Sequence, residues 1–141
     1  MHSPVSHTVL FVDDDKDDLE FYGEILQETI SNLVIYQARS GSEAIRLLNA
    51  AELPDSLPRL IIIDMNMPVM DGMETILQIK KEKRFSPIPI VVLSTARVLR
   101  ESGQLQMLGI SHFTKPSSYA EMKKIAQLLL RFFNDENNPP R

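Results

Sequence analysis

Charged and hydroxyl side chains follow four short apolar runs in this chain of 141 residues. Asp13 and Asp14 come after one run, Asp64 after a second, Ser94 after a third and Lys115 after a fourth. Each is ordinary alone, since an acidic turn often begins a helix and Lys-Pro is a common turn. Their occurrence together at the ends of apolar runs predicts a shared site.

Three carboxylates this close together would either raise a pKa or bind a cation. Oxygen ligands with room for several waters suit Mg²⁺. Lys115 would add a positive charge and Ser94 a hydroxyl donor. The set suits the attack of a carboxylate on a phosphoryl group whose oxygens are neutralised by Mg²⁺ and an ammonium.

The apolar runs predict the strands that would position these side chains. Residues 8–12, 60–63 and 90–93 are apolar without alternation, which is typical of parallel strands buried on both faces. Residues 33–38 and 110–114 are more mixed in character and are predicted as weaker strands at the sheet edges.

Segments with the apolar spacing of helices lie between these strands and after the last one, and residues 72–81 are an example. Ser40 to Glu43 supplies capping chemistry before one such helix. The helix at 97–108 is the weakest, because Gly103 costs about 1 kcal/mol there. Five β-α repeats predict an α/β fold, a doubly wound parallel sheet of five strands with five helices on both faces. Ligands of such sheets bind at the carboxyl ends of the strands.

Composition restricts the function classes. The chain has no cysteine, so disulfides, thiolate metal sites and cysteine nucleophiles are excluded. The formal net charge of −4 argues against nucleic-acid binding. No apolar run approaches the roughly 18–20 residues of a membrane span, and a cytoplasmic protein is predicted. One domain at 8–133, flexible tails at 1–7 and 134–141, and no output domain are expected.

Four segments together resemble the receiver domains of two-component response regulators. They are VLFVDDD, LIIIDMNMPVMDG, IPIVVLSTA and FTKPSSYAEM, in this order within Thr8 to about Phe133. The resemblance implies a flavodoxin-like receiver fold with strand order 2-1-3-4-5.

The resemblance also implies roles for the acidic residues. Asp64 would be the phosphoacceptor. Asp14 would bind Mg²⁺ directly, and Asp13 would bind it through a water molecule. Asn66 would offer its backbone carbonyl to the ion and turn its side chain toward the phosphoryl group.

Ser94 would be the switch hydroxyl that moves to bond a phosphoryl oxygen. Lys115 would pair with Asp64 before phosphorylation and with the phosphoryl group afterwards, and the Lys115–Pro116 bond would be cis. Pro68 would stiffen the loop after Asp64, and Gly72 would begin the third helix.

One position departs from the family pattern. Many receivers carry Tyr or Phe three residues before the lysine, where this chain has His112 followed by Phe113. His112 is therefore a switch candidate that would make output depend on pH, although a surface histidine is the commoner case. Four methionines near Asp64 are read as gap-fillers rather than metal ligands: Met65, Met67, Met70 and Met73.

The predicted function is a Mg²⁺-dependent phosphoacceptor supplied by a histidine kinase or phosphotransfer protein, with output through an unknown downstream protein. An aspartyl-phosphate hydrolase would need an acid at Asn66. A flavodoxin-like cofactor binder would not place aspartates after the first strand, where they repel phosphate. The alternative that stays open is a receiver-fold binding module that signals without phosphorylation.

Overall fold

The computed structural model describes residues 7–51, 56–67, 71–101 and 103–134. In chain order the elements are β1 (Thr8–Val12), α1 (Lys16–Thr29), β2 (Val34–Ala38), α2 (Gly41–Ala50), β3 (Leu60–Ile63), α3 (Gly72–Lys81), β4 (Ile90–Ser94), α4 (Ala96–Glu101), α5 (Gly103–Met107), β5 (Ser111–Thr114), α6 (Tyr119–Leu129) and the 3-10 helix η2 (Leu130–Phe133). The strands form one parallel sheet in the order β2-β1-β3-β4-β5. The predicted doubly wound fold and strand order are confirmed.

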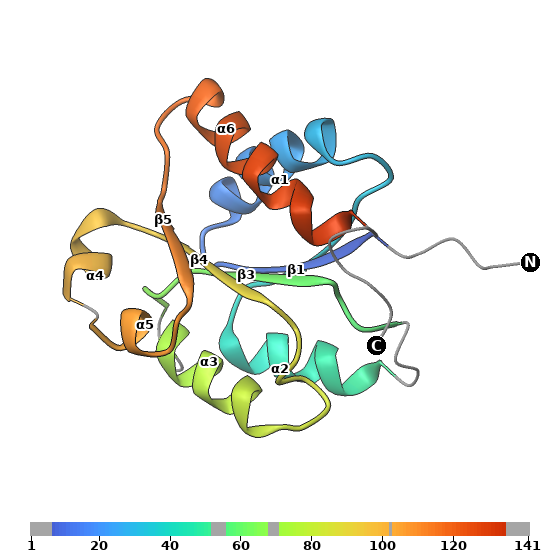
Figure 1. Ribbon diagram of the computed structural model, residues 1–141, viewed down its shortest axis with the longest axis vertical. Helices are drawn as coiled ribbons and strands as arrows, with labels where there is room; N and C mark the ends of the chain where they lie inside the picture. The colour runs from blue at the N-terminus through green and yellow to red at the C-terminus, as the bar shows by residue number, and fades with distance from the viewer. Residues whose placement is uncertain (1–6, 52–55, 68–70, 102, 135–141) are drawn as a thin grey trace, which may run out of the picture.

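Helices cover both faces of this sheet. Figure 1 shows α1 and α6 on one face and α2 and α3 on the other. Successive strand residues point to opposite faces, so Val9 and Phe11 pack with α1 and α6 while Leu10 and Val12 pack with α2 and α3. Every residue of β1, β3 and β4 is buried, which is why these strands are apolar without alternation.

The two mixed segments are the edge strands, as predicted. β2 and β5 each pair with one neighbour, and both are largely exposed. The three central strands that carry Asp13, Asp64 and Ser94 at their carboxyl ends are therefore fixed on both sides.

The segment 97–108 differs from the single helix that was predicted. It divides into α4, which begins at Ala96, and α5, which begins at Gly103. The described part of the chain thus has six α-helices rather than five. Residue 102, between these two helices, lies outside the described residues. Leu105 is fully buried and fixes α5 against the core.

Side-chain caps fix where the helices begin. Ser40 caps α2 by accepting a hydrogen bond from the Glu43 backbone N–H at 3.1 Å, as its capping chemistry predicted. Asp15 caps α1 and Asp71 caps α3. Asp15 therefore has the helix-capping role that is usual for an acidic run, and it sets the orientation of α1 beside the end of β1.

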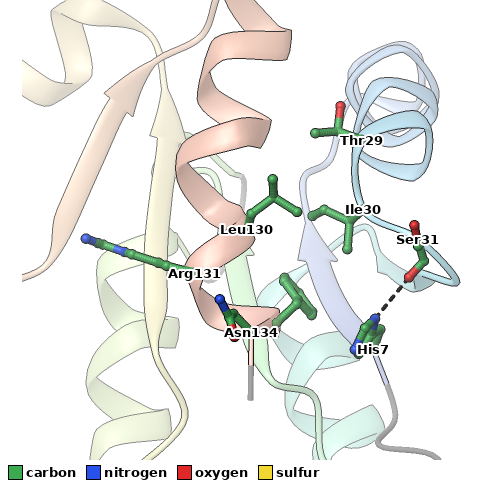
Figure 2. Close-up of a pocket in the computed structure, with 8 residues that line it drawn as sticks. His7, Thr29, Ile30, Ser31, Leu130, Arg131 and Asn134 are labelled. Atoms are coloured by element: carbon green, nitrogen blue, oxygen red, sulfur yellow. Dashed lines mark hydrogen bonds between the residues drawn. The ribbon is translucent and has the colours of Figure 1, made fainter. Parts of the chain in front are cut away.

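The ends of the described chain meet beside the amino end of β1. His7 donates from Nδ1 to the Ser31 carbonyl at 2.9 Å, and its ring lies edge-on to Phe133 at 5.7 Å. Figure 2 shows this corner, a pocket that Leu130 and Asn134 also line. Residues 1–6 and 135–141 lie outside the described residues, so the domain limits and tails stay predictions. Among the helices of the described ranges, none combines the length and apolar character that crossing a membrane requires.

Gly72 lets α3 begin directly against the end of β3. Its backbone N–H donates to the Met65 carbonyl at 3.1 Å. A Cβ at this position would collide with the Asp64 carbonyl oxygen and would lie 2.5 Å from Met65 Cα. Because both atoms belong to the backbone, no side-chain rotation relieves the contact. Pro68, in the preceding loop, lies outside the described residues.

Gly72→Ala is therefore expected to lower the free energy of unfolding by about 1–3 kcal/mol, the usual cost of overpacking. Urea unfolding measures it. The control is Gly103→Ala, where an added Cβ meets nothing within 4 Å and a better helix former replaces glycine. Equal stability of the two variants would contradict the proposed backbone contact.

Candidate functional site

The parallel sheet brings five of the predicted site residues together. Asp13 and Asp14 follow β1, Asp64 follows β3, Ser94 ends β4 and Lys115 follows β5. These four strands are neighbours in the sheet, and their carboxyl ends lie at one edge. Ser94 is the last residue of β4 rather than the first residue after it, and its side chain is fully buried.

The Asp64 carboxylate is enclosed and held by three groups. Its residue is 4% exposed. Oδ1 accepts a hydrogen bond from Ser94 Oγ at 2.5 Å and another from the Asn66 backbone N–H at 3.2 Å. Oδ2 lies 3.3 Å from Lys115 Nζ. Two hydrogen bonds therefore orient the carboxylate through Oδ1, whereas Oδ2 has the longer contact with Lys115.

Lys115 is surrounded by carboxylates from three elements. Its Nζ lies 2.7 Å from Asp18 Oδ2, 2.8 Å from Asp13 Oδ2 and 3.3 Å from Asp64 Oδ2. Its backbone N–H donates to the Ser94 carbonyl at 2.7 Å. Burial alone would lower the pKa of Lys115, but hydrogen bonds to Asp13 and Asp18 and the charge of Asp64 outweigh it and raise that pKa. Lys115 is thus held as an ammonium.

Asp13 is the most buried acid of the site, with no exposed surface. The Asp15 backbone N–H donates to its Oδ1 at 3.0 Å, and Lys115 pairs with its Oδ2. Burial raises the pKa of Asp13 to about 6, and the charge of Asp64 adds to this effect, while the hydrogen bonds from Lys115 and Asp15 oppose it. A cation bound nearby would favour the charged form of Asp13 and offset part of the cost of its burial.

Asp13, Asp14 and Asp64 form a group with the donor chemistry of a cation site. One carboxylate oxygen from each lies within 4.8 Å of the others. Asp14 is half-buried, so solvent reaches this side of the group. All three ligands are hard oxygens, as Mg²⁺ requires, and the open side leaves space for its water shell. The residues present therefore fit a divalent ion.

The side chains of the other predicted site residues make no contact with this charged group among the described residues. Asn66 contributes its backbone N–H to Asp64, and its side chain is exposed. His112 is exposed on β5, whereas Phe113 is half-buried and packs with the α1 and α6 cluster. Of the four methionines near Asp64, the three within the described ranges are buried core residues, as read from the sequence: Met65, Met67 and Met73. Met70 lies outside the described residues.

The Lys115–Pro116 peptide bond is trans, so the expected cis bond is wrong. The trans form is favoured for X–Pro bonds by about 0.5–1 kcal/mol. The trans chain already brings Lys115 Nζ to three carboxylates and the Pro116 carbonyl to the Tyr22 hydroxyl, which donates to it at 2.8 Å. No contact of the site requires the cis form.

Two residues on α1 belong to the site and were not predicted from the sequence. Asp18 contacts Lys115, and Tyr22 contacts the next residue, Pro116. The i, i+4 spacing of Asp18 and Tyr22 places both on one face of α1, and this spacing was the available signal. In the sequence, Asp18 belongs to the mostly acidic run 13–18, which is typical of a solvated turn at the start of a helix.

Comparison with known proteins gives a consistent result over nearly the whole chain. A family model described as "Response regulator receiver domain" matches residues 9–127. The Arabidopsis thaliana "Two-component response regulator ARR7" is 30% identical over 130 residues, which are 87% of this chain and 62% of that protein. The Synechocystis "Response regulator Rcp1" is 32% identical over 90 residues, which are 62% of this chain and 61% of that protein. The chain thus spans less than two thirds of these relatives.

Solved structures agree with the fold. The phosphorylated cyanobacterial phytochrome response regulator RcpA is 28% identical, with a TM-score of 0.76 over 90% of this chain and 93% of that one. The Mn²⁺-bound form of response regulator Rcp1 is 28% identical, with a TM-score of 0.74 over 90% and 94% of the two chains.

The raised pKa of Asp13 predicts a pH dependence of stability in the absence of divalent cations. The carboxyl has a pKa near 3.8 unfolded and about 6 folded, so the folded state binds its proton more tightly between these values. Its contribution to stability is present below about pH 4 and is lost as the pH rises through about 6. In the presence of a chelator, raising the pH over this range is expected to destabilise the parent but not Asp13→Asn. The free energy of unfolding of Asp13→Asn should therefore rise relative to that of the parent by about 2–3 kcal/mol.

Urea unfolding at several pH values measures this difference. Asp17→Asn is the control, because Asp17 is exposed on the same acidic segment. If the difference in free energy of unfolding between Asp13→Asn and the parent does not change from pH 4 to 7, Asp13 ionises as an ordinary surface acid.

Proposed function

Because this chain belongs to the response regulator receiver family, we propose that Asp64 accepts a phosphoryl group from a histidine kinase or phosphotransfer protein and so switches a partner-binding surface. The observation that carries this proposal is the convergence on Asp64 of the Ser94 hydroxyl and the Lys115 ammonium, beside the Asp13 and Asp14 carboxylates. A hydroxyl, an ammonium and a cation site around one buried carboxylate are the groups that an aspartyl phosphate needs.

The transfer step balances without a further reactant. A carboxylate oxygen of Asp64 attacks the phosphorus of a phosphohistidine and forms a P–O bond. The P–N bond breaks, and its electron pair returns to the imidazole nitrogen, which can take a proton from solvent. The hydrogen bonds that Asp64 Oδ1 accepts from Ser94 and the Asn66 backbone fix the carboxylate for in-line attack.

After the transfer, the new phosphoryl oxygens are stronger acceptors than the carboxylate. Ser94 Oγ would move its hydrogen bond from Asp64 Oδ1 to a phosphoryl oxygen, and Lys115 Nζ would approach the same group. The displacement of Ser94 would pull on the chain into α4, which follows it within two residues. A local charge change would thus bias the surface formed by α4, α5 and β5. The role of His112 on this surface stays a prediction.

Receiver domains bind Mg²⁺ at an acidic pocket, and here Asp13, Asp14 and Asp64, with the backbone carbonyl of Asn66, would hold the ion. When bound, Mg²⁺ neutralises charge on the phosphoryl oxygens. Lys115 would add a second positive charge at the phosphoryl group, since its Nζ contacts Asp64 Oδ2 and Asp13 Oδ2.

The role we assign is signalling rather than turnover of an external substrate. Receiver domains are signalling modules, and Asn66 lacks the proton-transfer chemistry of an aspartyl-phosphate hydrolase at the second position after the nucleophile. Output through a protein partner in the cytoplasm, without nucleic-acid binding, is part of this proposal. The net charge of −4 supports it.

Acetyl phosphate with Mg²⁺ is expected to add one phosphate to the protein, detectable by intact-mass spectrometry and lost on standing as a labile acyl phosphate hydrolyses. Asp64→Asn should abolish the adduct because the nucleophilic carboxylate is gone. A chelator should prevent it because the phosphoryl charge is then not neutralised.

Asp17→Asn is the matched control and should be phosphorylated like the parent. An adduct of equal yield on Asp64→Asn would move the acceptor elsewhere. A parent protein that takes no phosphate from acetyl phosphate or from phosphohistidine donors would favour a receiver-fold binding module that signals without phosphorylation.

A further inference from the structure

Lys115 has more partners than a phosphoacceptor site needs. Its ammonium carries three N–H donors, and three carboxylate oxygens lie within reach, at 2.7 Å for Asp18, 2.8 Å for Asp13 and 3.3 Å for Asp64. The two shortest contacts are those with Asp18 and Asp13, not the one with Asp64. The ammonium is therefore held closest to residues other than the carboxylate that we propose as phosphoacceptor.

The two short contacts differ in how easily they can be given up. The Asp13 side chain is fully buried, whereas the Asp18 side chain is 28% exposed. If Lys115 left Asp13, a buried carboxylate would lose its counterion at a high cost. If Lys115 left Asp18, water would solvate the freed carboxylate. Asp18 is thus the partner that Lys115 can exchange for another anion.

The backbone near Lys115 is fixed by hydrogen bonds that do not involve its ammonium. Tyr22, one turn after Asp18 on α1, is 5% exposed and donates its hydroxyl to the Pro116 carbonyl at 2.8 Å. The Lys115 backbone N–H donates to Ser94. The long lysine stem can therefore move Nζ between anions without moving the loop.

We propose that Asp18 is a positioning residue that holds Lys115 in the unphosphorylated state and competes for it with the phosphoryl group on Asp64. This proposal rests on the function proposed above and deepens it. Asp18 stabilises only the resting form, because Lys115 exchanges Asp18 for the phosphoryl oxygens. The acid on α1 thereby opposes phosphorylation and sets how readily the switch turns on.

Beryllofluoride tests this competition, because it bonds to a carboxylate oxygen as a tetrahedral phosphoryl mimic without being hydrolysed. At saturating Mg²⁺, Asp18→Asn is expected to bind beryllofluoride about fivefold more tightly than the parent, since the resting state alone loses a charge pair. Fluorine NMR titration measures the affinity. Asp18→Glu, which keeps the charge on a longer stem, should return the affinity toward the parent value.

Two controls separate this effect from a general loss of negative charge. Asp17→Asn removes the same charge from the next position of α1, and Asp17 is not among the described carboxylates within reach of Nζ. It should leave the affinity unchanged. In a Lys115→Met background, adding Asp18→Asn should produce no further gain, because the competition requires the ammonium.

The outcomes distinguish the two proposals. Equal affinities for Asp18→Asn and Asp17→Asn, or weaker binding by Asp18→Asn, would overturn the role of Asp18 and leave the proposed function standing. A gain that persists in the Lys115→Met background would also overturn it, because direct repulsion by Asp18 would then be the cause. A parent protein that binds no beryllofluoride and takes no phosphate would overturn both.

Discussion

The concentration of negative charge at one edge of the sheet constrains everything around it. Asp13, Asp18 and Asp64 lie around the single ammonium of Lys115, and Asp14 stands beside them. Carboxylates at such distances repel one another strongly where water is excluded. They are tolerated because Lys115, Ser94 and backbone N–H groups supply compensating donors. The same imbalance leaves the site poised to bind a cation.

The parallel sheet makes this arrangement possible. Four neighbouring strands end at the same edge, so residues distant in sequence meet without long loops. Gly72 then allows α3 to begin against the backbone of Asp64 and Met65, so that α3 lies directly against the carboxyl end of β3. Asp15 caps α1 and orients the helix that carries Asp18 and Tyr22. The site is thus positioned by strand ends and helix starts.

Much of this could be predicted from the sequence, because the signals are local. Buried parallel strands are continuous apolar runs, and the residue after such a run, Asp13 or Asp64, is identified by counting. Asp18 could not be predicted with the same ease. The local sequence around an acidic residue in the first turn of a helix is the same whether that residue faces solvent or a buried lysine. Which of the two it faces depends on how α1 is rotated relative to β5.

Two contacts join α1 to the segment after β5. Tyr22 and Pro116 are separated by 94 positions in the sequence, and Asp18 and Lys115 by 97. Asp13 and Asp18 therefore gain their ammonium partner only when the segment after β5 is in place. The group of charges at this edge of the sheet is complete only once β5 pairs with β4, so it is a property of the whole fold and not of any single loop.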